Sequence, residues 1–327
     1  MGDCLFCSVL KDEMQDFLDL KRALGFKYIS EQSMLIRIDR YLTDSGLNKR
    51  EISKEICEGW CRKQSHESLS NQASRISVMR VFARYLNDIG ISAYIPTFGY
   101  SKRKHRYSAH IYSADELERF FAAVDVSQSV LSECPFRGEV MPIFFRILYS
   151  SGLRVSELRL IRISDFNLDE GYLFIKGAKN HKDRLVPVHP ALVQKCRELR
   201  ASIHQQSSPD EYFFMQYPGR PMTLACVYKN FRRYLRKAGI SHTGRGPRVH
   251  DFRHTYCVNL LLKWSSEGKD LMAYLPYMRT MLGHEGFEET AYYLKLTADA
   301  YPVIRQSIEQ SFPSIIEEVD FDDREYY

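Results

Sequence analysis

The chain has 327 residues, of which 44% are hydrophobic and 13% aromatic, and its formal net charge is +5. This length exceeds one average domain, and the apolar content is enough for two buried cores, which excludes a wholly disordered protein. The last eleven residues carry a charge of −5, so the rest of the chain carries +10. A basic body of this kind favours a nucleic-acid partner.

The cysteines and the apolar runs indicate the compartment. The start of the chain has no signal-peptide pattern, and no apolar run approaches the ~20 residues of a membrane span. We therefore expect no membrane association and a cytoplasmic protein associated with the nucleoid, with free thiols. Cys4 and Cys7 have zinc-ligand spacing, but no second pair follows, and Cys57 and Cys61 suit helix packing. The sequence predicts no metal site and no cofactor.

Apolar residues recur at helical spacing between residues 10 and 90 and predict four helices. We assign residues 1–97 to one helical domain. Its polar faces are basic, either as solvated surface or as a nucleic-acid-binding face; the cations are Lys21, Arg22, Lys27, Arg37, Arg40, Arg75, Arg80 and Arg84.

A basic segment without periodicity, residues 98–112, follows as an interdomain linker. Its cations Lys102, Arg103, Lys104 and Arg106 are candidates for contact with backbone phosphates, which makes binding salt-dependent. Ser113 and Glu116 then have the spacing of a capping box and begin the next helix.

The second domain, residues 113–311, mixes helices with a few short strands. Strands are predicted at Phe166, 172–175 and 185–188, and helices at 190–202, 224–237, 250–263, 271–281, 287–294 and 301–311. An acidic tail, 312–327, closes the chain. The expected fold is mainly α with a small β-sheet.

Several polar residues in this domain suit phosphate chemistry. His250 and Arg253 share one helix face if that segment is helical, and an imidazole beside a guanidinium suits an anion. Leu282-Gly283-His284 follows, and Tyr293 lies nine residues after His284. A phenol beside such cations can attack phosphorus. An ordinary pair of buried amphipathic helices would also explain the His-x-x-Arg pattern alone.

Two upstream residues complete a set. Arg154 follows Gly152 at the start of a helical turn, and Lys179 lies where two predicted strands turn. In chain order, Arg154, Lys179, His250, Arg253, His284 and Tyr293 resemble the catalytic set of the tyrosine recombinase (phage integrase) family. The resemblance covers roughly residues 113–304.

The resemblance implies a helical core-binding domain followed by a mixed α/β catalytic domain, joined by a linker that completes a clamp around DNA. It implies double-stranded recombination sites as partners, four protomers in the synaptic complex, and possible accessory DNA-bending or directionality factors. The helix that follows the nucleophile often docks on a neighbouring protomer in this family, or it packs in cis.

The resemblance also assigns roles. Tyr293 attacks the scissile phosphate to form a 3′-phosphotyrosyl link, Arg154 and Arg253 hold the non-bridging oxygens, and Lys179 is the general acid. His250 and His284 contact the phosphate or move a proton, without metal or ATP. Tyr292 competes with Tyr293, and Lys182 competes with Lys179 and is otherwise a DNA contact. Glu157 either orients Arg154 or decorates a helix surface, and His181 and His254 are expected to be structural.

Three alternatives stand beside this interpretation. A type IB topoisomerase shares the chemistry, but the contexts of Arg154 and His284 look like those of integrases. A DNA-binding regulator without catalysis would form no covalent adduct. Among recombinases, the two-domain layout predicts an integrase or transposase of a mobile element, with an Xer-like dimer resolvase as the alternative.

Overall fold

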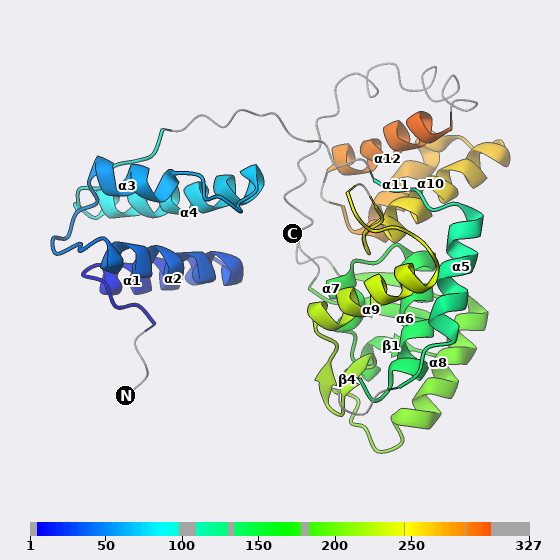
Figure 1. Ribbon diagram of the computed structural model, residues 1–327. Helices are drawn as coiled ribbons and strands as arrows, with labels where there is room; N and C mark the ends of the chain where they lie inside the picture. Colours follow the sequence, from blue (N-terminus) through cyan, green and yellow to red (C-terminus); the bar gives the residue numbers. More distant parts are fainter. Residues whose placement is uncertain are drawn as a thin grey trace. The chain divides into compact units, whose positions relative to one another are not determined.

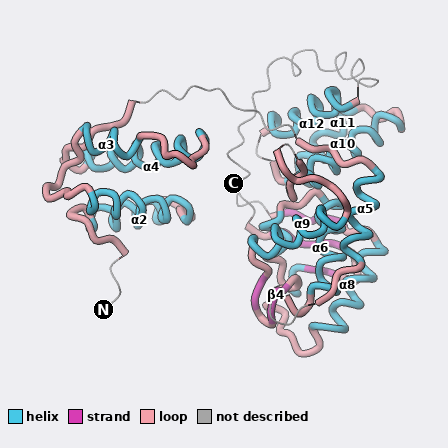
Figure 2. The backbone as a smooth tube through the Cα atoms, in the orientation of Figure 1, coloured by secondary structure: helices cyan, strands magenta, loops and turns pink. Residues whose placement is uncertain are grey.

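The computed structural model describes residues 5–97, 109–129, 134–177, 183–244, 246–284 and 286–301. Several sequence-predicted features lie outside these ranges: Lys102, Arg103, Lys104, Arg106, Lys179, His181, Lys182, the helix expected over 301–311 beyond its first residue, and the acidic tail. The chain divides into two compact units between His105 and Arg106 (Figure 1). Helices predominate, and the named strands belong to the second unit (Figure 2).

Four helices form the first unit, as the periodicity predicts: α1 Lys11–Ala23, α2 Ile29–Asp44, α3 Lys54–Cys61 and α4 Leu69–Asp88. Ser53 and Ser68 begin α3 and α4, because each side-chain oxygen accepts a hydrogen bond from the backbone N–H three residues on. Each helix buries one apolar face in a common core, which includes Cys57 and Cys61.

The prediction that Arg75 lies on a polar helix face is wrong, because this side chain is buried. Arg75 is only 1% exposed, and its guanidinium donates to both carboxylate oxygens of Glu67 at 2.9 and 2.8 Å. It also donates to the carbonyl of Arg62 and lies over the ring of Trp60. A guanidinium with its charge and donors matched in this way can leave water.

The core of the second unit is aromatic and joins four helices: α5 Ala114–Asp125, α6 Arg137–Ser151, α9 Leu224–Lys237 and α10 Asp251–Ser266. Phe120 on α5 is central, with ring centroids 5.5 Å from Phe145, 5.6 Å from Phe231 and 5.2 Å from Phe252. The capping box of Ser113 and Glu116 begins α5 as predicted.

A three-stranded antiparallel sheet lies beside this core, in the order β1-β2-β3. Its strands are β1 Phe166–Asn167, β2 Tyr172–Ile175 and β3 Arg184–Pro187, preceded by α7 Val155–Arg159 and the 3-10 helix Ile163–Asp165. Ile175 pairs with Arg184 at the end of the β2–β3 ladder nearest the connecting segment, and Gly177 N–H donates to Asp183 Oδ1 at 2.8 Å. This ladder and hydrogen bond therefore fix the two points, Gly177 and Asp183, between which the described chain is interrupted.

The remaining elements are α8 Pro190–Ile203 and a two-stranded sheet that the sequence pattern does not predict, β4 Met215–Tyr217 with β5 Arg220–Pro221. α11 Leu271–Leu282 and α12 Phe287–Ala300 gather with α10 at one end of the unit, where they share a second hydrophobic cluster (Figure 1). None of the described helices has the length and hydropathy of a bilayer span. The expected fold class, mainly α with a small sheet, is confirmed.

Candidate active site

The end of α6 places Arg154 at the site. Gly152 ends the helix at φ +64°, and a Cβ at this position would lie 2.7 Å from Tyr256 Cδ1 and 3.0 Å from Leu282 Cδ2. Only glycine satisfies both the left-handed backbone and this close approach. Arg154 then begins α7, with a side chain that is 14% exposed and Nη1 3.4 Å from Glu157 Oε1.

The Glu157 side chain is buried beside Arg154 and contacts more than one cation. Its Oε2 accepts from the Arg154 backbone N–H at 2.9 Å and from Arg184 Nη2 at 2.7 Å. Burial raises the pKa of Glu157, but the hydrogen bond from Arg184 and the charges of Arg184, Arg253 and Arg154 outweigh it and leave the pKa below its ordinary value. Glu157 therefore orients Arg154 and is not surface decoration.

Sequence reasoning gives Arg184 no role, yet it anchors the hairpin to this site. Its Nε donates to the carbonyl of Met281 at 2.9 Å, and Gly283 packs so closely that a Cβ there would lie 2.8 Å from Arg184 Nη1. The signal is strand alternation: Arg184 is two residues from buried Val186, so it faces inward, where an arginine requires a carboxylate.

Arg253 is 1% exposed and joins three segments that are distant in sequence. Its Nη1 donates to the carbonyl of Gly152 at 2.7 Å, and its Nη2 donates to the carbonyl of Leu282 at 3.0 Å. The same Nη2 lies 2.7 Å from His284 Nε2. The end of α6, the start of α10 and the loop after α11 thus meet at one guanidinium.

His284 is a neutral imidazole in this arrangement. Arginine only donates, so His284 Nε2 accepts, and Nδ1 carries the hydrogen that is donated to Thr290 Oγ1 at 3.0 Å. Burial, and then the charges of Arg253 and Arg154, lower the pKa of His284 to about 2.

Two further histidines lie on α10 and at its start. The ring centroids of His250 and His254 are 4.8 Å apart. Burial, reinforced by the charges of neighbouring His254 and Arg253, lowers the pKa of His250 well below its ordinary value. Burial and Arg253 lower the pKa of His254 to about 3. His254 also lies 5.6 Å from the Tyr293 ring, so it belongs to the site, and its i+4 spacing from His250 is the signal for this.

Tyr293 lies inside the site but out of contact with solvent. It is 1% exposed, and its ring is parallel to that of His284, with centroids 5.8 Å apart and planes at 4°. Its hydroxyl lies beside the Cys257 thiol, and burial raises the pKa of that thiol to about 12. Tyr292 is half-buried, with its ring 5.9 Å from that of His254. Both tyrosines are close to the histidines, and Tyr293 is the more deeply packed.

The structure therefore brings five of the six predicted residues together: Arg154, His250, Arg253, His284 and Tyr293. Lys179 lies outside the described residues. Arg154 and Arg184 contact the Glu157 carboxylate, and Arg253 is near enough for its charge to act on it, so arginines outnumber carboxylates here and the site is suited to an anion. Within the described ranges, no cluster of three or more histidine, cysteine or acidic residues has the form of a metal site.

Comparison with known proteins agrees with this geometry. Residues 112–299 match the Phage integrase family. The y4rB protein of Sinorhizobium fredii, described as an integrase/recombinase, is 29% identical over 295 residues, which cover 88% of this chain and 93% of that protein. The tyrosine recombinase XerC of Bacillus pumilus is 27% identical over 301 residues, which cover 88% of this chain and 84% of XerC.

Solved structures share the fold. The integrase of the Tn1549 transposon, in complex with circular intermediate DNA, has a TM-score of 0.63 at 17% identity and covers 91% of this chain and 98% of its own. The XerH recombinase bound to palindromic difH substrate has a TM-score of 0.60 at 20% identity, with 87% and 78% covered. The chain belongs to the phage integrase family of tyrosine recombinases and is a site-specific DNA recombinase.

Proposed function

We propose that this recombinase is the integrase or transposase of a mobile element and that Tyr293 cleaves DNA through a 3′-phosphotyrosyl intermediate. The observation that carries the proposal is the junction at Arg253: its guanidinium lies 2.7 Å from His284 Nε2, and His284 lies parallel to Tyr293. A guanidinium that can bind phosphate, a neutral imidazole and a phenol are thus consecutive neighbours.

Arg154 and Arg253 would hold the non-bridging oxygens of the scissile phosphate, where negative charge concentrates in the transition state. Loss of one such donor commonly costs ~10²-fold or more in rate. The contact between Arg154 and Glu157 supports this role, because a guanidinium whose orientation is fixed beforehand loses little entropy on binding. His250 would contact the same phosphate.

Lys179 is the proposed general acid, with Lys182 as the alternative. Both belong to the hairpin between β2 and β3. Arg184, the first residue of β3, is hydrogen-bonded to Glu157, which also accepts from the backbone N–H of Arg154. This link supports a hairpin lysine at the scissile phosphate, where it would protonate the leaving 5′-oxygen; a positioned acid contributes ~10²–10⁴-fold.

In the proposed step, the Tyr293 hydroxyl loses its proton as its oxygen attacks phosphorus, and the bond between phosphorus and the 5′-oxygen breaks. His250 receives the proton, because both ring nitrogens of His284 are already engaged by Arg253 and Thr290, and the lysine protonates the leaving 5′-oxygen to give the 5′-hydroxyl. The phosphotyrosyl ester retains the energy of the phosphodiester, so a second 5′-hydroxyl can reverse the step without ATP. Because Tyr293 is 1% exposed, α12 has to shift before attack.

The DNA partner is proposed from the relatives: the Tn1549 integrase and XerH were solved with DNA. Residues 1–97 would be the core-binding domain, 98–112 the DNA-contacting linker, 113–311 the catalytic domain and 312–327 the acidic tail. Four protomers would join two double-stranded sites on the nucleoid, with accessory factors setting direction.

Covalent trapping on nicked suicide DNA that carries a terminus of the element tests the chemistry. The wild type should form an SDS-resistant adduct without magnesium, Tyr293→Phe should form none, and Tyr292→Phe should retain it. An adduct lost only in Tyr292→Phe would move the nucleophile by one residue. Specific binding without any adduct would contradict the catalytic proposal and favour a regulator.

The likeness to XerC supports the resolvase as the second candidate. A plasmid assay separates the two. An integrase joins an element terminus to a target on a second molecule, whereas a resolvase only separates directly repeated sites on one circle. Joining between molecules would favour the integrase, and exclusive resolution would contradict it.

A further inference from the structure

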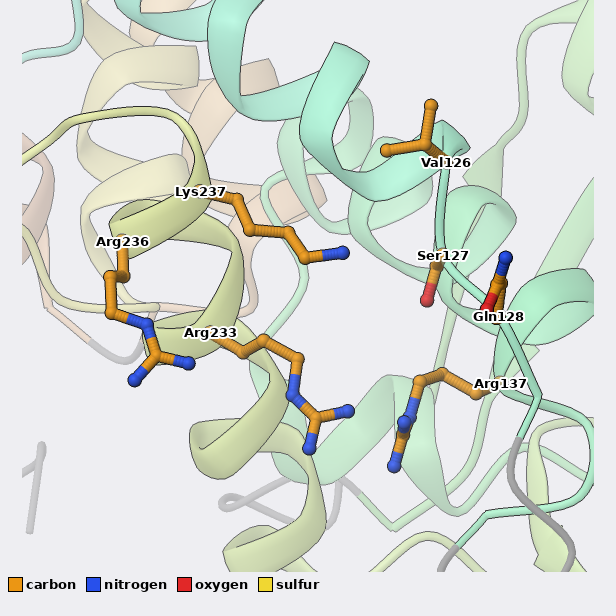
Figure 3. Close-up of a pocket in the computed structure, with 7 residues that line it drawn as sticks. All are labelled: Val126, Ser127, Gln128, Arg137, Arg233, Arg236 and Lys237. Carbon is orange, nitrogen blue, oxygen red and sulfur yellow. The ribbon is translucent and has the colours of Figure 1, made fainter.

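A basic cavity of about 380 Å³ lies between α9, the start of α6 and the segment after α5 (Figure 3). It is lined by Val126, Ser127, Gln128, Arg137, Arg233, Arg236 and Lys237. Arg233 and Lys237 reach from α9 toward Arg137 and Ser127 on the facing segments (Figure 3). The volume is within the range of ~300–1,000 Å³ that small-molecule sites occupy.

The cavity wall is positively charged. Four of the seven lining residues are cations, and none of the seven is a carboxylate. Asp125, next to Val126 in the chain, instead pairs with Arg146 through two contacts of 2.7 Å. Arg137 is only 4% exposed, so this cation is largely shielded from water, unlike a charge on a solvated surface. Several guanidinium groups around one space match the oxygens of phosphate.

The cavity is separate from the active site. Arg137 is the first residue of α6, and Arg154 follows the last turn of the same helix. The helix rises 1.5 Å per residue, so its two ends are roughly 20 Å apart. A phosphate in this cavity is therefore a different group from the one that Arg154 and Arg253 would hold.

We propose that this cavity is a second phosphate site of the catalytic unit, which binds either a phosphodiester of bound DNA or a small phosphate compound. Two exposed cations, Arg236 and Lys237, form its mouth, and Arg137 and half-buried Arg233 lie deeper. Only the DNA source rests on the proposed function; the phosphate site itself stands on the lining residues.

Calorimetric titration of the full chain with inorganic pyrophosphate tests the site. The double variant Arg233→Ala/Lys237→Ala removes two cavity cations, and Lys229→Ala/Arg232→Ala removes two exposed cations of α9 outside the cavity. We expect the cavity variant to bind pyrophosphate about tenfold more weakly or worse, and the control to stay within about twofold. Equal weakening in both, or no binding by the wild type at about millimolar pyrophosphate, would overturn the proposal.

Two further titrations distinguish this site from the active site and identify the source of phosphate. Binding should persist in Arg154→Ala, and its loss there would place the pyrophosphate in the active site and overturn the proposal. Titration with duplex DNA already bound then separates the sources, because blocked binding indicates a DNA phosphodiester and retained binding a small phosphate compound. Tyr293→Phe should lose the covalent adduct but keep pyrophosphate binding, so the two proposals fail independently.

Discussion

Arg253 Nη2 lies 2.7 Å from His284 Nε2, and this contact fixes the protonation of the histidine. A protonated His284 would turn an N–H toward a guanidinium that has no acceptor. The contact therefore exists only with neutral His284, which is consistent with its depressed pKa. Since the same guanidinium also binds the carbonyls of Gly152 and Leu282, protonation of His284 would disturb the whole junction.

The free energy of unfolding should decrease as the pH is lowered, because of His284 and His254. Their pKa values are lowered from 6.5 to about 2 and about 3, so the unfolded chain takes up protons below pH 6.5 while the folded chain does not. The free energy of unfolding is therefore fully present above pH 6.5 and decreases between pH 6.5 and about 3, by about 1 kcal/mol per histidine per pH unit. Urea unfolding at pH 7, 6 and 5 measures this slope.

The variant His284→Gln isolates one of these groups. Glutamine replaces the imidazole with a neutral amide that does not titrate, so the loss of stability between pH 6 and 5 should be smaller than in the wild type by about 1 kcal/mol. His66→Gln, at an exposed position of the first unit, is the control and should leave the slope unchanged. If the variant and the wild type lost equal stability between pH 6 and 5, His284 would have to take up its proton in the folded protein over the same pH range as in the unfolded chain.

The fold was largely predictable because helical periodicity is strong in both units. The two short strands β4 and β5 have three and two residues, too few for alternation to show. Burial of Arg75 was not predictable, because its partner Glu67 lies in a loop outside the apolar pattern. Periodicity assigns faces to elements, but it does not reveal which polar residue finds a partner.

The candidate site was predictable as a set of residues but not as a geometry. Motif order identified Arg253 and His284, yet the 2.7 Å contact between them depends on how α10 and α11 pack. Arg184 and Cys257 were missed because each acts through a neighbour: Arg184 through Glu157, and Cys257 through Tyr293. Such supporting residues have no motif of their own.

The ion pair between Glu157 and Arg184 should show strong coupling. The side chains are 9% and 5% exposed, and loss of one partner leaves the other charge buried. Glu157→Gln and Arg184→Met should each lower the free energy of unfolding by about 3 kcal/mol or more, whereas the double variant should cost less than the sum. Chemical denaturation of all four proteins gives the coupling energy. Strict additivity would show that the two groups do not act as a pair.

Gly152→Ala should lower the stability of the protein more than Gly268→Ala does. Gly268 has a similar φ of +66° and nothing within 4 Å of an added Cβ, so Gly268→Ala reports the backbone strain alone, about 1 kcal/mol. At Gly152 the added methyl would also meet Tyr256 and Leu282 and displace the carbonyl that Arg253 binds. The melting temperature and trapping rate should both fall for Gly152→Ala, and equal melting temperatures for the two variants would contradict the packing argument.

Cys257 should restrain the nucleophile. Its thiol lies beside the Tyr293 hydroxyl within the buried cluster of α10, α11 and α12, and α12 has to release this contact before the oxygen reaches a phosphate. A polar contact of this kind contributes about 0.5–1.5 kcal/mol net, so Cys257→Ala should speed adduct formation on suicide DNA about twofold to tenfold, while Cys257→Ser should keep the slower rate. Cys196→Ala removes an equally buried thiol on α8, in the other hydrophobic cluster, and controls for loss of packing. A slower rate in Cys257→Ala, with Cys196→Ala unchanged, would mean that the thiol instead aligns Tyr293 for attack.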